Sequence, residues 1–312
     1  MLWRQVLDAF DLLDSPHADG VRVERAMRDA GISDVAVSTL SGERGTPDAI
    51  RALIPGTRGK ASGGIAPTLG IIGRLGGIGA RPARIGFVSD GDGALVAIAC
   101  ALKLGLMARE DDCLDGDVIV ATHICPRAPV RPHQPVPFMG APVDGIQLNQ
   151  HDVDPAMDAI LSVDATKGNR IINVRGFAIS PTVKQGYILR VSEDLLEVMQ
   201  RVTGRAPVVF AISTQDITPY GNDLFHLNSI LQPSVATSAP VVGVALTTEV
   251  AVAGSATGAS HPDDIESAAR FCVEIAKEYG ARACRFYDDV EFERLRSRYG
   301  DMSHLQTLGT TV

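Results

Sequence analysis

The sequence predicts an α/β fold in which helices cover both faces of a mixed, mostly parallel sheet, a three-layer α/β/α sandwich. Short apolar segments typical of buried strands alternate along the chain with longer helical segments. The 312 residues, 45% hydrophobic and 21% charged, have the composition of a globular domain large enough to bury its own core. The sequence shows no interdomain linker and no internal repeat, so residues 1–312 are expected to form a single domain.

The helices follow from apolar periodicity and from end signals. The first segment repeats apolar side chains at helical spacing, from Leu2 through Val6 to Leu13. Near the C-terminus, Pro262 and two acidic residues mark the start of a long helix. The segments predicted as helices are 2–14, 21–30, 94–106, 193–203, 263–279 and 288–299.

Strands are predicted where short runs rich in valine, isoleucine and other apolar residues are bounded by glycine, proline or polar residues. The segments predicted as strands are 34–40, 84–89, 117–122, 159–163, 177–179, 186–191, 208–212, 241–246 and 250–253. Residues 56–79 are rich in glycine and are assigned to no element. Residues 126–142 contain six prolines, which exclude both a helix and a central strand.

Composition limits the classes of partner. The net charge of −8 disfavours binding to nucleic acid, which requires a basic face. The longest apolar stretch, 94–106, is interrupted by Lys103 and is shorter than the roughly 20 residues of a membrane span, so no membrane partner is expected. Five cysteines at wide spacings, with no C-x-x-C pair, fit a reducing compartment, and a cytoplasmic location is expected.

Three predicted strands end on side chains that can bind a metal ion. Asp90 follows 84–89, His123 follows 117–122, and Asp164 follows 159–163. Ligands of open α/β sheets bind beyond the carboxyl ends of the strands, so these groups predict a site for a divalent ion, zinc first. Two other interpretations stay open: Asp90 caps the following helix, and His123 is a hydrogen-bonded loop histidine.

Further candidates surround this proposed centre. Asp92 and Asp223 are candidates for the group that takes up the proton of a metal-bound water. The proline-rich segment 126–142 is either a lid, which would add His133 as a metal ligand, or an arm that reaches a second subunit. If the segment is not a lid, His133 is expected to be an ordinary exposed histidine. We also expect a homo-oligomer.

A second group of polar residues follows the predicted strand 208–212. Asp216, Asn222 and His226 are candidates for substrate binding. The same stretch contains Pro219 and Gly221, and its simplest interpretation is a turn.

Several longer motifs resemble the domain-of-unknown-function family 1177. They are RLGGIG, FVSDGDGA, THICPRAP, PHQPVPFMG, SVDATKGNR and QDITPYGND, and the likeness extends from about residue 56 to residue 279. This family brings no established activity.

The order of elements also resembles, more distantly, the dizinc aminopeptidases of the glutamyl-aminopeptidase type. The resemblance implies that Asp90 corresponds to the aspartate that bridges two metals and Asp164 to a second aspartate ligand. The family's glutamate pair, which supplies the general base, is replaced by Thr122 and His123, and its early His-x-Asp pair has no counterpart before Asp90. His261 lies near the place of the last histidine ligand but several residues late.

Two functions follow from these patterns. The first is a metal-dependent hydrolase of an amide or peptide-like small substrate, with the ion on Asp90, His123 and Asp164. The second is a metal-free protein of the same fold that binds a small ligand without hydrolysing it, which the missing glutamates favour.

Overall fold

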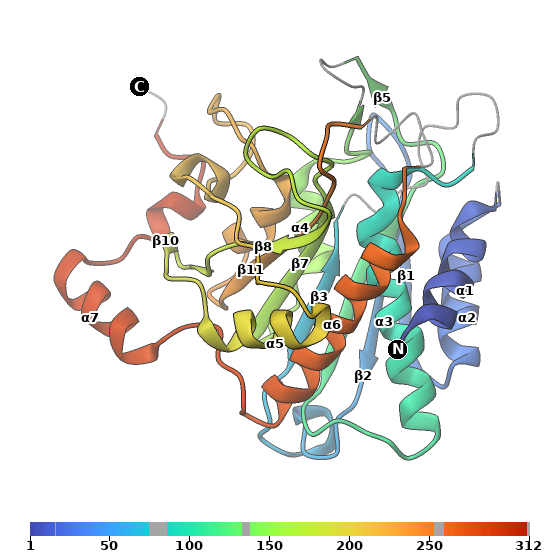
Figure 1. Cartoon of the computed structure of the whole chain (residues 1–312). Helices are drawn as coiled ribbons and strands as arrows, with labels where there is room; N and C mark the ends of the chain where they lie inside the picture. The colour runs from blue at the N-terminus through green and yellow to red at the C-terminus, as the bar shows by residue number, and fades with distance from the viewer. Residues whose placement is uncertain (16, 75–85, 133–137, 253–258, 311–312) are drawn as a thin grey trace.

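The computed structural model describes residues 1–15, 17–74, 86–132, 138–252 and 259–310 (Figure 1). Its α-helices are α1 (Trp3–Asp14), α2 (Gly20–Asp29), α3 (Asp92–Arg109), α4 (Gly145–Asp152), α5 (Glu193–Thr203), α6 (Pro262–Gly280) and α7 (Asp289–Tyr299). Short 3-10 helices are η1 (Lys60–Ser62), η3 (Ser89–Gly91), η4 (Thr214–Ile217), η5 (Ser229–Val235) and η6 (Ser303–Gln306). The strands are β1 (Asp34–Thr39), β2 (Asp48–Ile54), β3 (Leu69–Gly73), β4 (Val118–Ile124), β5 (Val130–Arg131), β6 (Phe138–Met139), β7 (Ala159–Ala165), β8 (Gly176–Ile179), β9 (Val183–Lys184), β10 (Tyr187–Ile188) and β11 (Val241–Thr247).

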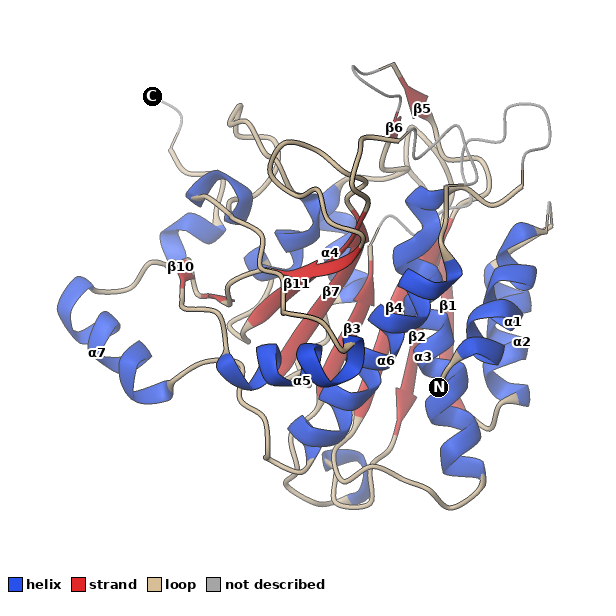
Figure 2. Cartoon of the chain, in the orientation of Figure 1, coloured by secondary structure: helices blue, strands red, loops and turns tan. Residues whose placement is uncertain are grey.

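The main sheet has the strand order β1-β2-β4-β3-β7-β11-β9-β10, with β8 also paired to β11. The four central strands β4, β3, β7 and β11 are parallel, and the strands at both sides join antiparallel. Helices α3 and α6 pack on one face, whereas α4 and η5 pack on the other (Figure 2). The predicted α/β sandwich with a mixed sheet is therefore confirmed. Residues 130–131 and 138–139 form a separate two-stranded ribbon within the proline-rich segment.

Helix α3 is the centre of the core. By length and composition it could cross a membrane, but 78% of its most apolar window is buried inside the protein. It contacts β3, β4 and β7 on one side and α1 and α6 on the other. An apolar helix of this kind is expected where a helix is covered on all sides by protein.

The strand predicted at 84–89 is wrong in its described part, residues 86–89. Gly86 has a φ of +93°, a value that interrupts an extended strand, and the N–H of Phe87 donates to the Asp14 carboxylate instead of to a sheet neighbour. Asp90 consequently lies in η3, just before α3, and does not end a strand. Residues 84 and 85 lie outside the described residues.

Two further predicted strands are also wrong. Residues 208–212, all of them described, contribute an isolated bridge between Val209 and Ile179, and residues 250–252 belong to no strand. Conversely, β2 and β3 were not predicted. Strand β3 lies inside the glycine-rich stretch 56–79, where Gly70 and Gly73 hide the apolar pattern.

Two glycines allow the start of α3 to approach the carboxyl ends of the strands. A Cβ on Gly93 would stand 2.6 Å from the carbonyl oxygen of Val163 and 2.7 Å from that of Arg74. A Cβ on Gly73 would stand 2.5 Å from the carbonyl oxygen of Gly93. Because backbone atoms cannot move aside as a flexible side chain can, these positions hold α3 close to the strands that carry the site.

We therefore predict that Gly93→Ala lowers the free energy of unfolding by about 1–3 kcal/mol, since overpacking against backbone forces α3 away from β3 and β7. Gly145→Ala is the matched control, because Gly145 also begins a helix and its added Cβ would meet its nearest neighbour at 3.9 Å. Urea unfolding of both variants measures the difference. Equal stability of the two variants would contradict the close packing.

Candidate functional site at the carboxyl ends of the central strands

The sheet register brings three charged or polar side chains into one row. Gly73 at the end of β3 is paired with Thr122 of β4 and with Val163 of β7. The residues that follow these three are Arg74, His123 and Asp164, and side chains at equivalent positions of neighbouring strands point to the same face. His123 and Asp164 therefore lie in one row at the strand ends, with Arg74 between them.

Arg74 is 2% exposed and is held by α4. Its Nη1 donates to Oδ2 of Asp152 at 3.0 Å and to Oδ1 of Asn149 at 3.4 Å. Burial raises the pKa of Asp152 to about 6, and the nearby Arg74 cation opposes this rise. The amide nitrogen of Asn149 donates in turn to the carbonyl of Gln232 at 3.0 Å, which joins α4 to η5.

Asp164 is 3% exposed at the end of β7. One carboxylate oxygen accepts from the Ser229 hydroxyl at 2.8 Å, and the other accepts from the N–H of Ala165 at 2.7 Å. Burial raises the pKa of Asp164 to about 6, against the lowering effect of the Ser229 hydrogen bond. A carboxyl group that titrates so close to neutral pH can exchange protons with a bound molecule.

A second buried ion pair lies at the start of α3. Asp92, the first residue of α3, is fully buried, and its Oδ2 accepts from Nζ of Lys167 at 2.7 Å. Its other oxygen accepts from the Ser260 hydroxyl. Burial raises the pKa of Asp92, while Lys167 and Ser260 lower it. The sequence candidate for proton transfer is therefore engaged by a cation and a hydroxyl.

His123 is buried to 99% within β4, and its Nδ1 has no hydrogen-bond partner among the described residues. Burial, and to a smaller extent the Arg74 cation, lower the pKa of its imidazole to about 3. The side chain is therefore neutral at physiological pH.

A cavity of about 820 Å³ opens at these strand ends, and we call it the strand-end cavity. It lies between the loop after β7, the start of α4, and the segment from residue 219 to residue 235. Its polar lining includes Arg74, Asp90, Asp164, Lys167, Asn169, His226 and Ser229, and its apolar and aromatic lining includes Leu148, Tyr220, Ile230 and Val235. The lining residues in the described part of the chain do not include His123 or Asp92.

The remaining sequence candidates divide between the cavity and the neighbouring turn. Asp90 and His226 line the cavity. Asp216 is buried and accepts from the N–H and hydroxyl of Ser213, which makes it a cap of η4. Asn222 donates to the Thr218 hydroxyl at 3.2 Å, and Asp223 is exposed with a φ of 59°.

The proline-rich segment also reaches the cavity in its described part. Gly140 and Ala141 contribute to the lining. His133 lies outside the described residues. A lid or an oligomer arm at 126–142 stays a prediction.

The metal site predicted from Asp90, His123 and Asp164 does not assemble. Among the described residues, no group of three or more His, Cys, Asp or Glu side chains is placed to hold an ion. In the undescribed segments the sequence contains a single residue of these four types, His133. The physical reason is the Arg74 guanidinium, which stands in the row between His123 and Asp164 and would repel a second cation there. The residues present therefore do not fit the dizinc centre that the aminopeptidase resemblance implies.

The arrangement depends on residues that the sequence analysis missed, chiefly Arg74, Asp152, Lys167 and Ser229. One signal was available, because Arg74 follows the apolar segment LGIIG just as His123 and Asp164 follow theirs. Asp152 and Ser229 carry no such signal, since they reach the site through tertiary packing of α4 and η5.

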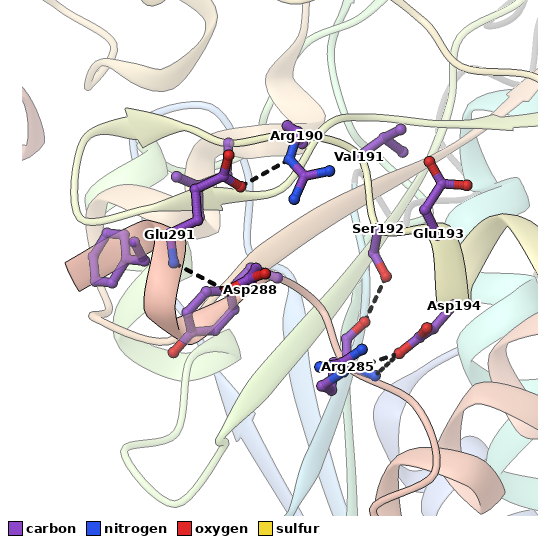
Figure 3. Close-up of a pocket in the computed structure, with 11 residues that line it drawn as sticks. Arg190, Val191, Ser192, Glu193, Asp194, Arg285, Asp288 and Glu291 are labelled. Carbon is purple, nitrogen blue, oxygen red and sulfur yellow. Dashed lines mark hydrogen bonds and ion pairs between the residues drawn. The ribbon is translucent and has the colours of Figure 1, made fainter. Parts of the chain in front are cut away.

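A second hollow, between α5 and α7, is a weaker candidate (Figure 3). Its volume is about 100 Å³. Arg190 binds Glu291 at 2.8 Å, and Arg285 binds Asp194 at 3.4 Å. Because these lining charges neutralise one another, the hollow is explained by its structural role in joining α7 to the domain.

The fold and the strand-end cavity define an α/β protein built like the aminopeptidases. The chain belongs to the family described as protein of unknown function (DUF1177), whose model matches residues 38–309. Among curated proteins, none matches the chain.

Solved structures show the same fold at low sequence identity. The bottromycin maturation enzyme BotP is 14% identical, with a TM-score of 0.52 and coverage of 88% of this chain and 69% of that one. BotP in complex with Mn gives 15% identity, a TM-score of 0.50 and coverage of 88% and 70%. The LapA aminopeptidase of Legionella pneumophila is 10% identical, with a TM-score of 0.51 and coverage of 89% and 70%. The aminopeptidase-like fold predicted from the order of elements is thus confirmed.

We predict that Asp164→Asn stabilises the protein at pH 7.5 by on the order of 2 kcal/mol. The folded-state pKa of about 6 lies above the ordinary aspartate value near 3.9, so stability is lost as the pH rises from about 4 to 6 and the carboxyl group ionises inside the fold. An amide avoids that ionisation and can still pair with Ser229 and with the N–H of Ala165. Denaturant unfolding at pH 7.5 and 4.5 should show the gain shrinking at the lower pH.

Asp216→Asn is the control for this prediction. Its carboxylate accepts four hydrogen bonds, so the amide should destabilise the protein at both pH values. A pH-independent effect of Asp164→Asn would contradict the raised pKa.

Proposed function

We propose that this protein binds a small amide or peptide-like molecule in the strand-end cavity and that it does so without a resident metal ion. The observation that carries the proposal is the Arg74 guanidinium, fixed by Asp152 between the ends of β4 and β7. The side chain of Arg74 thus places a permanent positive charge where a metal ion would otherwise supply one. It also makes the position unfavourable for a divalent cation.

The chemistry of the cavity suits a molecule that contains amide groups. Arg74 and Lys167 supply donors, Asp164 supplies an acceptor, and Tyr220 and Ile230 supply apolar surface. The volume of about 820 Å³ lies within the roughly 300–1,000 Å³ usual for sites of small molecules. The similar solved structures include an enzyme of peptide maturation and an aminopeptidase, which supports a peptide-like ligand by analogy of fold.

A second candidate is hydrolysis of such a ligand, and the contact between Asp164 and Ser229 favours it. A carboxylate with a pKa of about 6 is suited to take up a proton from water or from the Ser229 hydroxyl that already donates to it. Arg74, in the adjoining position of the row, could stabilise negative charge that develops on a carbonyl oxygen. A zinc-dependent hydrolase would need metal ligands other than those that the described part of the chain brings together.

The cytoplasmic location, the homo-oligomeric state and the absence of nucleic-acid and membrane partners remain proposals from the sequence.

The first test is metal content. Protein purified without chelator, incubated with zinc, manganese or cobalt and then dialysed, should retain no stoichiometric metal by elemental analysis. EDTA should leave its melting temperature unchanged. His123→Ala should cost on the order of 1–3 kcal/mol of stability through lost packing and contacts and leave the metal content as it was.

The opposite outcome would decide against metal-free binding. One metal ion per chain in the wild type, lost in both His123→Ala and Asp164→Asn, would restore the metallohydrolase predicted from the sequence. Asp223→Asn is the matched control for these variants, since Asp223 is exposed and does not line the cavity.

The second test separates binding from hydrolysis. An excess of protein is incubated with a mixture of N-acetyl dipeptides and amino-acid amides, and products are followed by mass spectrometry. For a binding protein we expect ligand-dependent thermal stabilisation and no product. Cleavage that is lost in Asp164→Asn but retained in Asp223→Asn would instead establish the hydrolase, and the loss of cleavage in Ser229→Ala would show whether the hydroxyl takes part.

A further inference from the structure

We propose that Arg74 is the carboxylate-binding group of the strand-end cavity and that Asp152 is an internal carboxylate that competes with the ligand for the guanidinium. The inference rests on the proposed function, that the cavity binds a small peptide-like molecule, and it names the chemical feature that is recognised.

The ion pair between Arg74 and Asp152 uses one donor and one acceptor. Nη1 contacts Oδ2 of Asp152. Among the described residues, Nε of Arg74 and Oδ1 of Asp152 have no hydrogen-bond partner, although both atoms are buried. A guanidinium and a carboxylate that face each other fully form two parallel hydrogen bonds. The internal partner therefore leaves Arg74 with donor capacity that no described side chain uses.

Burial makes such unused capacity significant. Arg74 is 2% exposed and yet contributes to the lining of the cavity. A buried polar group without a partner is unfavourable, and a carboxylate or an ordered water bound to the guanidinium of Arg74 would use donors that the described side chains leave unused. The planar fork of an arginine matches the geometry of a carboxylate better than that of a single carbonyl oxygen.

The other buried cation of the cavity is less available. Lys167 forms its contact with Asp92 at 2.7 Å, and Asp92 is also bound by the Ser260 hydroxyl. Its ammonium is consequently compensated by a carboxylate that lies at hydrogen-bond distance. Lys167 adds positive potential near the cavity, whereas Arg74 offers the free donor.

Asp164 constrains the rest of the ligand. It is next to Arg74 in the row and lines the same cavity, so a ligand carboxylate on Arg74 would lie near a group that prefers a donor. A molecule with an amide N–H beside its carboxylate satisfies both side chains. N-acyl amino acids and the C-terminal residue of a short peptide have this arrangement.

The test uses two probes of nearly the same shape, N-acetyl-L-alanine and N-acetyl-L-alaninamide, which differ in the charge of one group. Binding to the wild type is measured by isothermal titration up to 50 mM probe. We expect the acid to bind at least about tenfold more tightly than the amide, because hydrogen bonds between two charged groups are stronger than those to a neutral group.

Two variants assign the effect to Arg74. In Asp152→Asn the competing charge is removed, and affinity for the acid should rise about tenfold. In the double variant Arg74→Gln, Asp152→Asn the buried pair becomes neutral on both sides, which avoids an uncompensated buried charge. The preference for the acid should then disappear, while circular dichroism and thermal melting confirm that the variant is folded.

The outcomes separate the two proposals. Equal binding of acid and amide to the wild type, or a preference for the acid that survives in the double variant, would refute the assignment of Arg74 while the cavity would still bind small amides. Binding of neither probe would refute both this inference and the proposed function. An unchanged affinity for the acid in Asp152→Asn would refute the competition between Asp152 and the ligand.

Discussion

The buried ion pair between Arg74 and Asp152 determines the character of the site. It joins the carboxyl end of β3 to the last turn of α4, and the contact of Asn149 with the carbonyl of Gln232 extends the connection to η5. Burying two charges costs several kcal/mol in desolvation for each ion, which a single hydrogen-bonded contact offsets only in part. Replacing a buried ion pair by apolar residues is often neutral or stabilising in proteins, so stability alone does not account for the pair.

The same desolvation explains the unusual titration of the carboxylates nearby. Asp152 and Asp164 both have a pKa of about 6, and that of Asp92 is also raised, with burial as the largest cause in each case. Arg74 and Lys167 partly offset this effect but do not abolish it. Asp152 and Asp164 can therefore gain or lose protons between pH 5 and 7. A bound molecule could shift these protonation equilibria and so change the net charge of the site. A cavity with fixed cations and adjustable carboxylates can accept ligands that carry both a negative group and a hydrogen-bond donor.

The architecture and part of the site could be predicted because they are encoded locally. The boundaries of α5 matched residues 193–203, since Ser192, two acidic residues and Gly204 mark its ends. Asp164 was found because β7 is a clear apolar segment with a polar end. Strand β3 and Arg74 were missed because two glycines break up the apolar pattern: Gly73 is required by the close approach of α3, and Gly70 by the Met157 side chain. The strand at 84–89 was predicted from composition, but the positive φ of Gly86 overrides it. The partner of Arg74, Asp152, comes from tertiary packing that no local pattern reports.

Similarity of fold does not by itself transfer an activity to this chain. The aminopeptidase-like architecture places ligands at the carboxyl ends of the central strands, and the cavity is found there. The positive charge at this place nevertheless comes from the side chain of Arg74, which follows β3. The resemblance to dizinc enzymes would instead require metal ions there. An ion polarises a carbonyl and generates a nucleophilic hydroxide from water, whereas a guanidinium binds and stabilises an anion but leaves the pKa of water almost unchanged. The carboxylate recognition that we propose uses this property of the guanidinium, and the hydrolysis that we propose as the second candidate would use Asp164 as its base.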